Sequence, residues 1–259
     1  MSALESHHSV RPSPIFLAII GLTAFGGMLA YLDGADSKTM AYVSVFVFVI
    51  AGWVVSLCLH EFGHAFTAWR FGDHNIEARG YLDLDPRRYT HPLLSLVLPV
   101  IITAFGGIGL PGAAVYVRTS FMTAKQRTLV SLAGPAANVA LAVVLLGLTE
   151  LFFDLKHLVF WSGVAFLGFL QVTATLLNLL PIPGLDGYNA LEPHLSPETQ
   201  RALDQFKPYG FMILFFLIFA RPVNQAFFGF IGWLFELTGV PTVPVSLGMQ
   251  LIQIWHLFS

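Results

Sequence analysis

The sequence is poor in charged residues and in cysteine. Only 11% of its 259 residues are charged and 56% are hydrophobic, whereas soluble domains are about 25% charged and roughly 45–50% apolar. Because so few charges cannot cover a water-exposed surface, the chain is predicted to be a multi-pass membrane protein. The net charge of −2 excludes a basic nucleic-acid-binding protein. The single cysteine, Cys58, excludes a disulfide framework and a cysteine-based zinc finger.

Long apolar stretches divide the chain into candidate membrane helices, each of which needs about 20 apolar residues to cross the bilayer. The stretches that reach or approach this length are 15–32, 41–59 (continuing as helix to about 69), 129–149, 158–180 and 209–235. Arg221 and Pro222 interrupt the last stretch, which is either a kinked span or a short span followed by an interfacial helix. The sequence therefore predicts an all-α polytopic membrane protein with five to six membrane-spanning helices.

A further uncharged stretch, 93–117, is interrupted by two prolines and four glycines. Basic residues favour the cytoplasmic side of a membrane, and they flank this stretch on both sides, with Arg87 and Arg88 before it and Arg118 after it. Both flanks stay on one side if the stretch enters and leaves the membrane at the same face. We therefore predict a re-entrant glycine-rich segment, whose irregular backbone is tolerated where protein surrounds it.

The basic residues also orient the chain as a whole. They precede the first apolar stretch, follow the second and follow the glycine-rich stretch, whereas the opposite loops carry only Lys38 and Lys156. The first stretch lacks a clear cleavage site and is expected to remain as an uncleaved span. No loop is long enough for an inserted domain. Residues 1–259 are thus predicted to form a single membrane domain.

The second apolar stretch leads into the motif His60-Glu61-Phe62-Gly63-His64, which matches HExxH. Histidines four residues apart lie on one face of a helix, so both imidazoles can bind one metal ion. Glu61 lies beside that face, where it can take a proton from metal-bound water. The alternative is a set of polar residues near the lipid headgroups. Ionisable groups at an apolar span are costly, however, and indicate function.

Zinc hydrolases use three protein ligands and leave a fourth position open. The extended form of the motif would place a third histidine where this chain has Arg70. Asp186 is the remaining candidate, since it follows a run without formal charge and lies in the turn NLLPIPGLDG at 178–187. Pro181 and Pro183 end the preceding helix there. A lone aspartate in such a turn is also typical of a plain helix cap.

Other residues near the motif are weaker candidates for the third ligand. Cys58 points away from the histidine face and is expected to be a small buried apolar residue. Asp73 and Glu77 lie in a charged loop. Counting membrane crossings supports Asp186, because stretches 129–149 and 158–180 return the chain to the side of the histidines only if 93–117 does not cross.

Three motifs together resemble the site-2 protease family of intramembrane metalloproteases. They are HEFGH at 60–64, AGPAAN at 133–138 and NLLPIPGLDG at 178–187. The resemblance covers about residues 41–235, which would be the catalytic core of a single intramembrane metalloprotease domain. It implies that one Zn²⁺ per chain is bound by two histidines and an aspartate, with a glutamate as general base. These residues are His60, His64, Asp186 and Glu61.

The resemblance also assigns two asparagines. It implies that Asn178 contacts the substrate backbone or the developing oxyanion, and that Asn138 has a structural role in helix packing. The chain has no room for a PDZ domain and no tail for paired CBS domains, so it resembles a minimal form of the family. The stretch 93–117 is similar to the membrane-dipping segment of some bacterial members.

The implied function is zinc-dependent endopeptidase activity within the membrane. Peptide bonds in or near transmembrane segments would be hydrolysed by water activated by Zn²⁺ and Glu61, as in regulated intramembrane proteolysis. The expected partners are a transmembrane protein substrate and the lipid bilayer, with a regulatory partner protein as an open possibility and no nucleic acid. The expected location is a bacterial plasma membrane, with the active site toward the cytoplasm.

Two segments are candidates for handling the substrate. Residues 81–85 alternate apolar and acidic side chains, so they form either an edge strand that pairs with an extended substrate or an ordinary charged loop. The glycine-rich segment 105–112 is a candidate gate for substrate or water.

Other classes of membrane protein fit the sequence less well. A desaturase needs several histidine pairs, a rhomboid-like protease needs a Gly-x-Ser-Gly loop, and a presenilin-like protease needs a Gly-x-Gly-Asp partner for Asp186. None of these is present in the sequence. The main alternative is a catalytically inactive zinc-binding membrane scaffold related to the same family. Glu61 argues against it, because a structural zinc site needs no general base.

Overall fold

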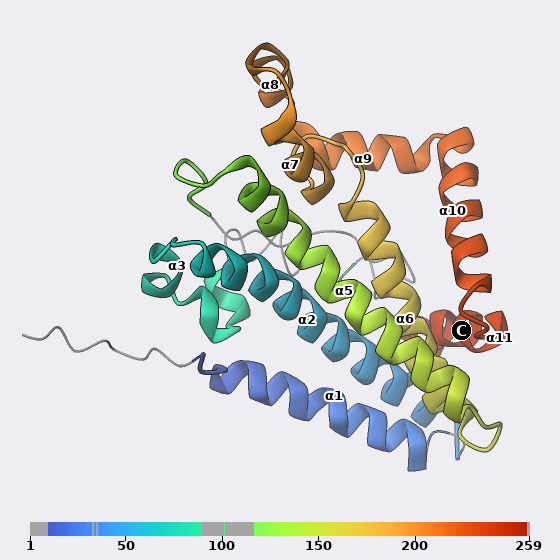
Figure 1. The fold of residues 1–259 in the computed structure, drawn as a ribbon. Coiled ribbons are helices and arrows are strands. Elements are labelled where there is room, and N and C mark those ends of the chain that lie inside the picture. Colours follow the sequence, from blue (N-terminus) through green and yellow to red (C-terminus); the bar gives the residue numbers. More distant parts are fainter. Residues whose placement is uncertain (1–9, 33, 35, 90–100, 102–116, 258–259) are drawn as a thin grey trace, which may run out of the picture.

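The computed structural model describes residues 10–32, 34, 36–89, 101 and 117–257, and these residues form helices and loops without a strand. Four of the helices are long and apolar enough to cross a membrane (Figure 1). They are α1 (Pro14–Leu32), α2 (Lys38–Arg70), α5 (Ala124–Phe152) and α6 (Leu158–Asn178). The predicted re-entrant stretch 93–117 lies outside the described residues, apart from Ile101 and Val117.

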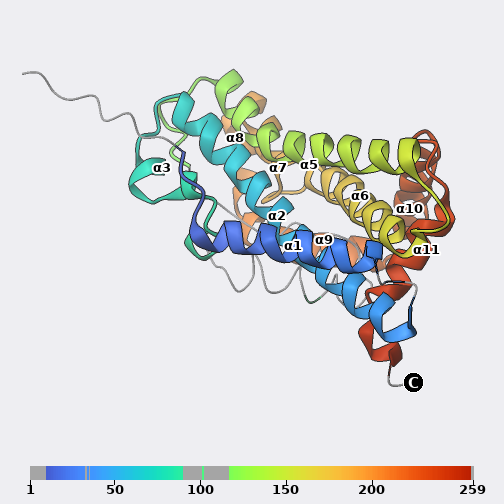
Figure 2. The ribbon, with the colours of Figure 1, turned by 90° about the horizontal axis from the view of Figure 1, so that it is seen from below.

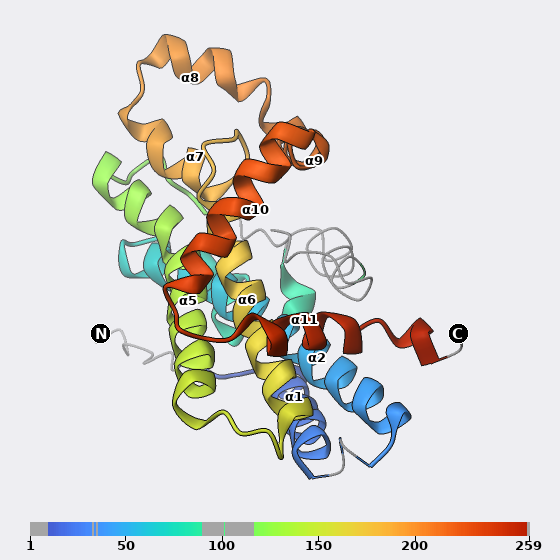
Figure 3. The same ribbon diagram turned by 90° about the vertical axis from the view of Figure 1, so that its right-hand side faces the viewer.

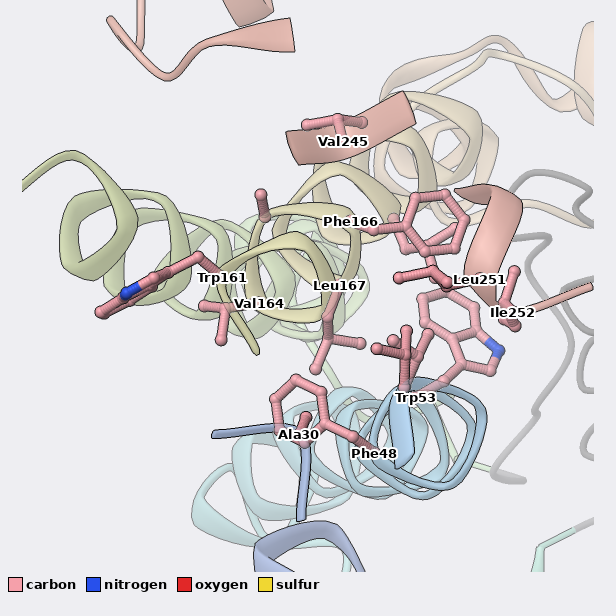
Figure 4. Close-up of a cluster of buried hydrophobic side chains, with 14 of the residues drawn as sticks. Ala30, Phe48, Trp53, Trp161, Val164, Phe166, Leu167, Val245, Leu251 and Ile252 are labelled. Carbon is pink, nitrogen blue, oxygen red and sulfur yellow. The ribbon is translucent and has the colours of Figure 1, made fainter. Parts of the chain in front are cut away.

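Helix α2 is the central element, because it packs against α1, α5 and α6, and Figure 2 shows α1 lying alongside it. It has 33 residues, and at about 1.5 Å per residue it exceeds the roughly 30 Å hydrocarbon layer. Its N-terminal half is packed into a cluster of buried apolar side chains that includes Trp53 from α2 and Phe166 and Leu167 from α6 (Figure 4). Gly52 permits this contact, since a Cβ there would lie 2.7 Å from Leu167 Cδ2.

The C-terminal part of the chain follows α6 through shorter helices. It comprises α7 (Asp186–Leu191), α8 (Pro197–Asp204), α9 (Gly210–Phe219), α10 (Arg221–Glu236) and α11 (Thr242–Leu251). The predicted stretch 209–235 is thus two helices that meet at Ala220, and Pro222 stands in the first turn of α10, where its missing N–H is not needed. Figure 3 shows α10 running past α6 toward α11, which packs on α6.

The loop after α2 decides between the two alternatives for residues 81–85. Residues 81–85 do not form an edge strand, because Tyr81–Asp83 is a turn of 3₁₀ helix. Gly80 and Leu84, on either side of this turn, have positive φ values of 69° and 56°, which an extended strand does not allow. Tyr81 and Leu82 are both buried despite being adjacent. The alternation of apolar and acidic residues therefore reflects a packed turn.

Candidate metal centre

The two histidines of α2 lie one helical turn apart and point at the same place. Both side chains are buried, and their Nε2 atoms are 3.1 Å apart. Asp186 joins them from the first residue of α7, with Oδ2 at 3.2 Å from His60 Nε2 and 3.4 Å from His64 Nε2. The three candidate ligand atoms all lie within 4.8 Å of one another. The structure therefore brings together the three side chains that the sequence singled out.

The turn after α6 carries Asp186 to the histidines. Gly184 has a φ of 98°, a conformation that favours glycine. Gly187 packs directly on the end of α6, where a Cβ would lie 2.2 Å from the carbonyl oxygen of Leu179. The two glycines thus allow the chain to fold back tightly enough for Asp186 to reach α2.

Polar contacts hold α7 against α5. Thr128 donates a hydrogen bond of 2.8 Å to the carbonyl oxygen of Ala190. Glu192, just after α7, lies 2.7 Å from Lys207 Nζ and 3.4 Å from Arg127 Nη2. Burial alone lowers the pKa of Lys207, but its hydrogen bonds to Asp204 and Glu192 outweigh this effect and raise it. This charged cluster fixes the position of the helix that presents Asp186.

The other ring nitrogen of each histidine faces an oxygen. His64 Nδ1 lies 2.7 Å from the backbone carbonyl of Val130, which can only accept a hydrogen bond, so Nδ1 carries the proton. His60 Nδ1 lies 2.5 Å from Oδ1 of Asn138. Both Nε2 atoms therefore keep a lone pair directed at Asp186, as metal-binding histidines require.

The space between these atoms suits a metal ion. Gly134 of α5 faces it, and a Cβ there would lie 2.2 Å from His64 Nε2 and 2.6 Å from His60 Nε2. Only a glycine leaves this position clear. Two imidazole nitrogens and one carboxylate oxygen form a donor set typical of catalytic zinc sites, which keep a fourth position open. The residues present therefore fit a zinc ion.

Glu61 lies beside the donor atoms without joining them. Its side chain is 1% exposed, and Oε1 lies 3.9 Å from His60 Nε2. Asn178 is the last residue of α6 and is buried, at the end of the helix from which the chain turns to Asp186. Asn138 does more than pack between helices, since it contacts His60 directly. Sequence reasoning did not predict this contact.

The weaker ligand candidates lie elsewhere. Cys58 is fully buried and packs with Phe16, Leu84 and Tyr89, which confirms the prediction of a buried apolar role. Asp73 accepts a hydrogen bond of 2.7 Å from the backbone N–H of Arg118. It therefore connects two loop segments.

These features define a class of protein, a helical membrane protein in which two buried histidines and a partly buried aspartate meet beside a buried glutamate. Its relatives include two proteins named "Putative zinc metalloprotease Rip2". The one from Mycolicibacterium smegmatis is 63% identical over 255 residues, which are 98% of each chain. The one from Mycobacterium tuberculosis H37Rv is 62% identical over 258 residues, which are 100% of each chain.

A more distant relative from Bacillus subtilis is named "Putative zinc metalloprotease YwhC". It is 30% identical over 192 residues, which are 71% of this chain and 84% of YwhC. The chain belongs to the site-2 protease family. No family model matches it, and no solved structure matches it.

Proposed function

We propose that the protein is a zinc-dependent endopeptidase that cleaves membrane proteins in or near their transmembrane segments. The observation that carries this proposal is the position of Glu61, a buried carboxylate 3.9 Å from His60 Nε2 and adjacent to the three convergent ligand atoms. A structural metal site needs ligands only. A buried acid beside an incomplete ligand set is the arrangement that hydrolysis requires.

The residues of the site divide the chemistry between them. His60, His64 and Asp186 would hold the zinc ion, which when bound polarises the scissile carbonyl and acidifies water. Glu61 takes a proton from the attacking water while the oxygen of that water bonds to the carbonyl carbon. The same proton then passes from Glu61 to the amine as the C–N bond breaks. The Asn178 amide donates a hydrogen bond to the developing oxyanion.

The setting of the site supports a membrane substrate. The histidines are part of a helix that is long and apolar enough to cross the bilayer, so a substrate that reaches them comes from the membrane or its edge. The basic residues after α2 and before α5 support an orientation in which this end of the molecule faces the cytoplasm. We infer a bacterial plasma membrane, a re-entrant path for 93–117, and a role in regulated proteolysis in which a partner protein could take part.

The test is cleavage of a single-span membrane protein by the purified chain in lipid vesicles. We expect Glu61→Gln to keep its zinc and to lose cleavage by about 1,000-fold or more, because the proton carrier is lost while the ligands remain. Glu150→Gln makes the same change at an exposed position near the C-terminal end of α5, and should cleave like the wild type. Undiminished cleavage by Glu61→Gln would refute the mechanism. Bound zinc without cleavage by the wild type would favour the inactive scaffold.

A further inference from the structure

A chain of buried hydrogen bonds leads from the metal site into the apolar interior. Beyond His60, the Nδ2 of Asn138 donates to Oε1 of Gln171 over 3.0 Å. The Nε2 of Gln171 in turn donates to Oγ of Ser56 over 2.9 Å. All four side chains are buried, and Gln171 is fully so. This series of hydrogen bonds thus passes from α2 through α5 and α6, and returns to α2 one turn before His60.

The hydroxyl of Ser56 gives this chain a direction. Its proton is used within α2, where Oγ lies 2.9 Å from the carbonyl oxygen of Trp53 and 3.1 Å from that of Gly52. With its proton directed at these carbonyls, the hydroxyl oxygen accepts the hydrogen bond from Gln171. This orients the Gln171 amide with its oxygen toward Asn138, which in turn presents an oxygen to His60.

The opposite direction would disable the ligand. If Ser56 donated to Gln171, both amides would turn over, and Asn138 would offer an N–H to His60 Nδ1. The proton of the neutral imidazole would then be on Nε2, the atom that faces Asp186. A protonated Nε2 has no lone pair for a metal ion. The direction of the chain therefore decides whether His60 can bind zinc.

The two histidines differ in the kind of group that keeps the proton on Nδ1. His64 is fixed by the backbone carbonyl of Val130, which cannot turn over. His60 is held by an amide side chain that can present either an oxygen or a nitrogen, so a further device is required to select the oxygen. This requirement explains a glutamine at a fully buried position in α6, where a polar side chain is costly in a membrane helix.

We propose that Gln171 and Ser56 are positioning residues of the metal centre, which act through Asn138 to keep the proton of His60 on Nδ1 and its Nε2 free for zinc. This inference rests on zinc binding as stated in the proposed function, but not on proteolysis.

The experiment measures zinc affinity of the full chain in detergent by competition with a chromophoric chelator. We expect Gln171→Met to weaken zinc binding about 10-fold and Ser56→Ala to weaken it about 3- to 10-fold. Loss of a group that holds a metal ligand directly typically lowers metal affinity about 10- to 100-fold, and these two residues act less directly. Matched controls are Thr173→Val on α6 and Ser44→Ala on α2. Both hydroxyls are fully buried and bond to carbonyls of their own helices, and both variants should bind zinc within 2-fold of the wild type.

A second measurement reports the position of the proton itself. In zinc-free protein with ¹⁵N-labelled histidine, the His60 signals are assigned by their loss in His60→Ala. The wild type should show protonated Nδ1, and Gln171→Met should show a population with protonated Nε2. The double variant Ser56→Ala/Gln171→Met should bind zinc no more weakly than Gln171→Met alone, because Ser56 acts only through Gln171.

Several results would overturn the inference. On the side of zinc affinity, they are values for Gln171→Met and Ser56→Ala within 2-fold of the control variants, control variants that lose as much affinity as the test variants, or a double variant whose loss is the sum of the two single losses. On the side of the proton, it is a His60 tautomer that is the same in Gln171→Met and the wild type. A wild type that binds zinc without cleaving any substrate refutes the protease function, and the affinity series still tests this inference. A wild type that binds no zinc refutes both.

Discussion

The two halves of α2 are both deeply buried, yet they are held by different kinds of contact. The half that contains Val49 and Trp53 lies in an apolar cluster with α6 and α11, where shape decides the fit. The half that contains Ser56, His60 and His64 also touches apolar side chains, but its polar side chains are held by hydrogen bonds to α5 and α6. Changes in the first half should therefore act on stability, and changes in the second on metal binding.

The largest effect is expected at Gly134. A Cβ there meets both Nε2 atoms, and α5 packs closely on α2 beside this position, since a Cβ at Gly63 would lie 2.6 Å from the carbonyl oxygen of Ala133. Gly134→Ala should therefore abolish zinc binding, measured by metal analysis, while the chain still folds. Gly147→Ala on the same helix, where a Cβ meets no atom within 4 Å, should bind zinc normally. Full zinc occupancy in Gly134→Ala would contradict the proposed position of the metal.

The apolar half should show the opposite behaviour. Phe166→Ala should lower the free energy of unfolding by about 2 kcal/mol, below the roughly 3–5 kcal/mol of soluble cores because the unfolded helices remain in lipid or detergent. Zinc affinity of the folded protein should not change. Unfolding in mixed micelles measures the first quantity, and Leu151→Ala, at a position 74% exposed, is the control. A large loss of zinc affinity in Phe166→Ala would break the distinction between the two halves.

The charged cluster behind α7 should have a smaller effect on the metal. Glu192→Gln removes the partner of Lys207 and Arg127 and loosens the helix that presents Asp186. We expect zinc affinity to fall about 3- to 10-fold, comparable to the loss of a supporting group. Chelator competition measures it, with the exposed Glu198→Gln as control. Equal affinities in the two variants would show that α7 needs no such support.

The smallest effect is expected at the opposite end of the molecule. A hydrogen bond from His157 lowers the pKa of Asp154 to about 2, below its ordinary value of about 3.9. A lowered pKa in the folded state stabilises the protein above about pH 4, and this contribution is lost as the pH falls toward 2. The difference in melting temperature between wild type and Asp154→Asn should therefore shrink over that range. A difference that is constant with pH would contradict this ionic contribution.

The sequence predicts the parts of the site that depend on short spacing or on isolated charge. The HExxH spacing places two imidazoles on one helix face, and Asp186 is conspicuous because it ends a long uncharged run. The connection of Gln171 to Ser56 could not be predicted, because it depends on the rotation and depth of three helices relative to one another. The same holds for Asn138, whose contact with His60 is set by how closely α5 approaches α2.

The fold was predictable to a similar degree. The four long helices follow from apolar length, and the interruption at Arg221 and Pro222 corresponds to the boundary between α9 and α10. Of the two alternatives for 81–85, the structure excludes the edge strand, because alternation is also produced by a turn between residues of positive φ. The membrane path of α9 and α10 stays a prediction, since it depends on the bilayer as well as on the chain.

The order of the ligands along the chain has a consequence for synthesis. Asp186 comes after α5 and α6, whereas the two histidines lie before them. While the ribosome is still adding these helices, the growing chain contains the histidines and Glu61 without the third ligand. The complete ligand set exists only once the chain has passed Asp186, so a product truncated before α7 cannot assemble it.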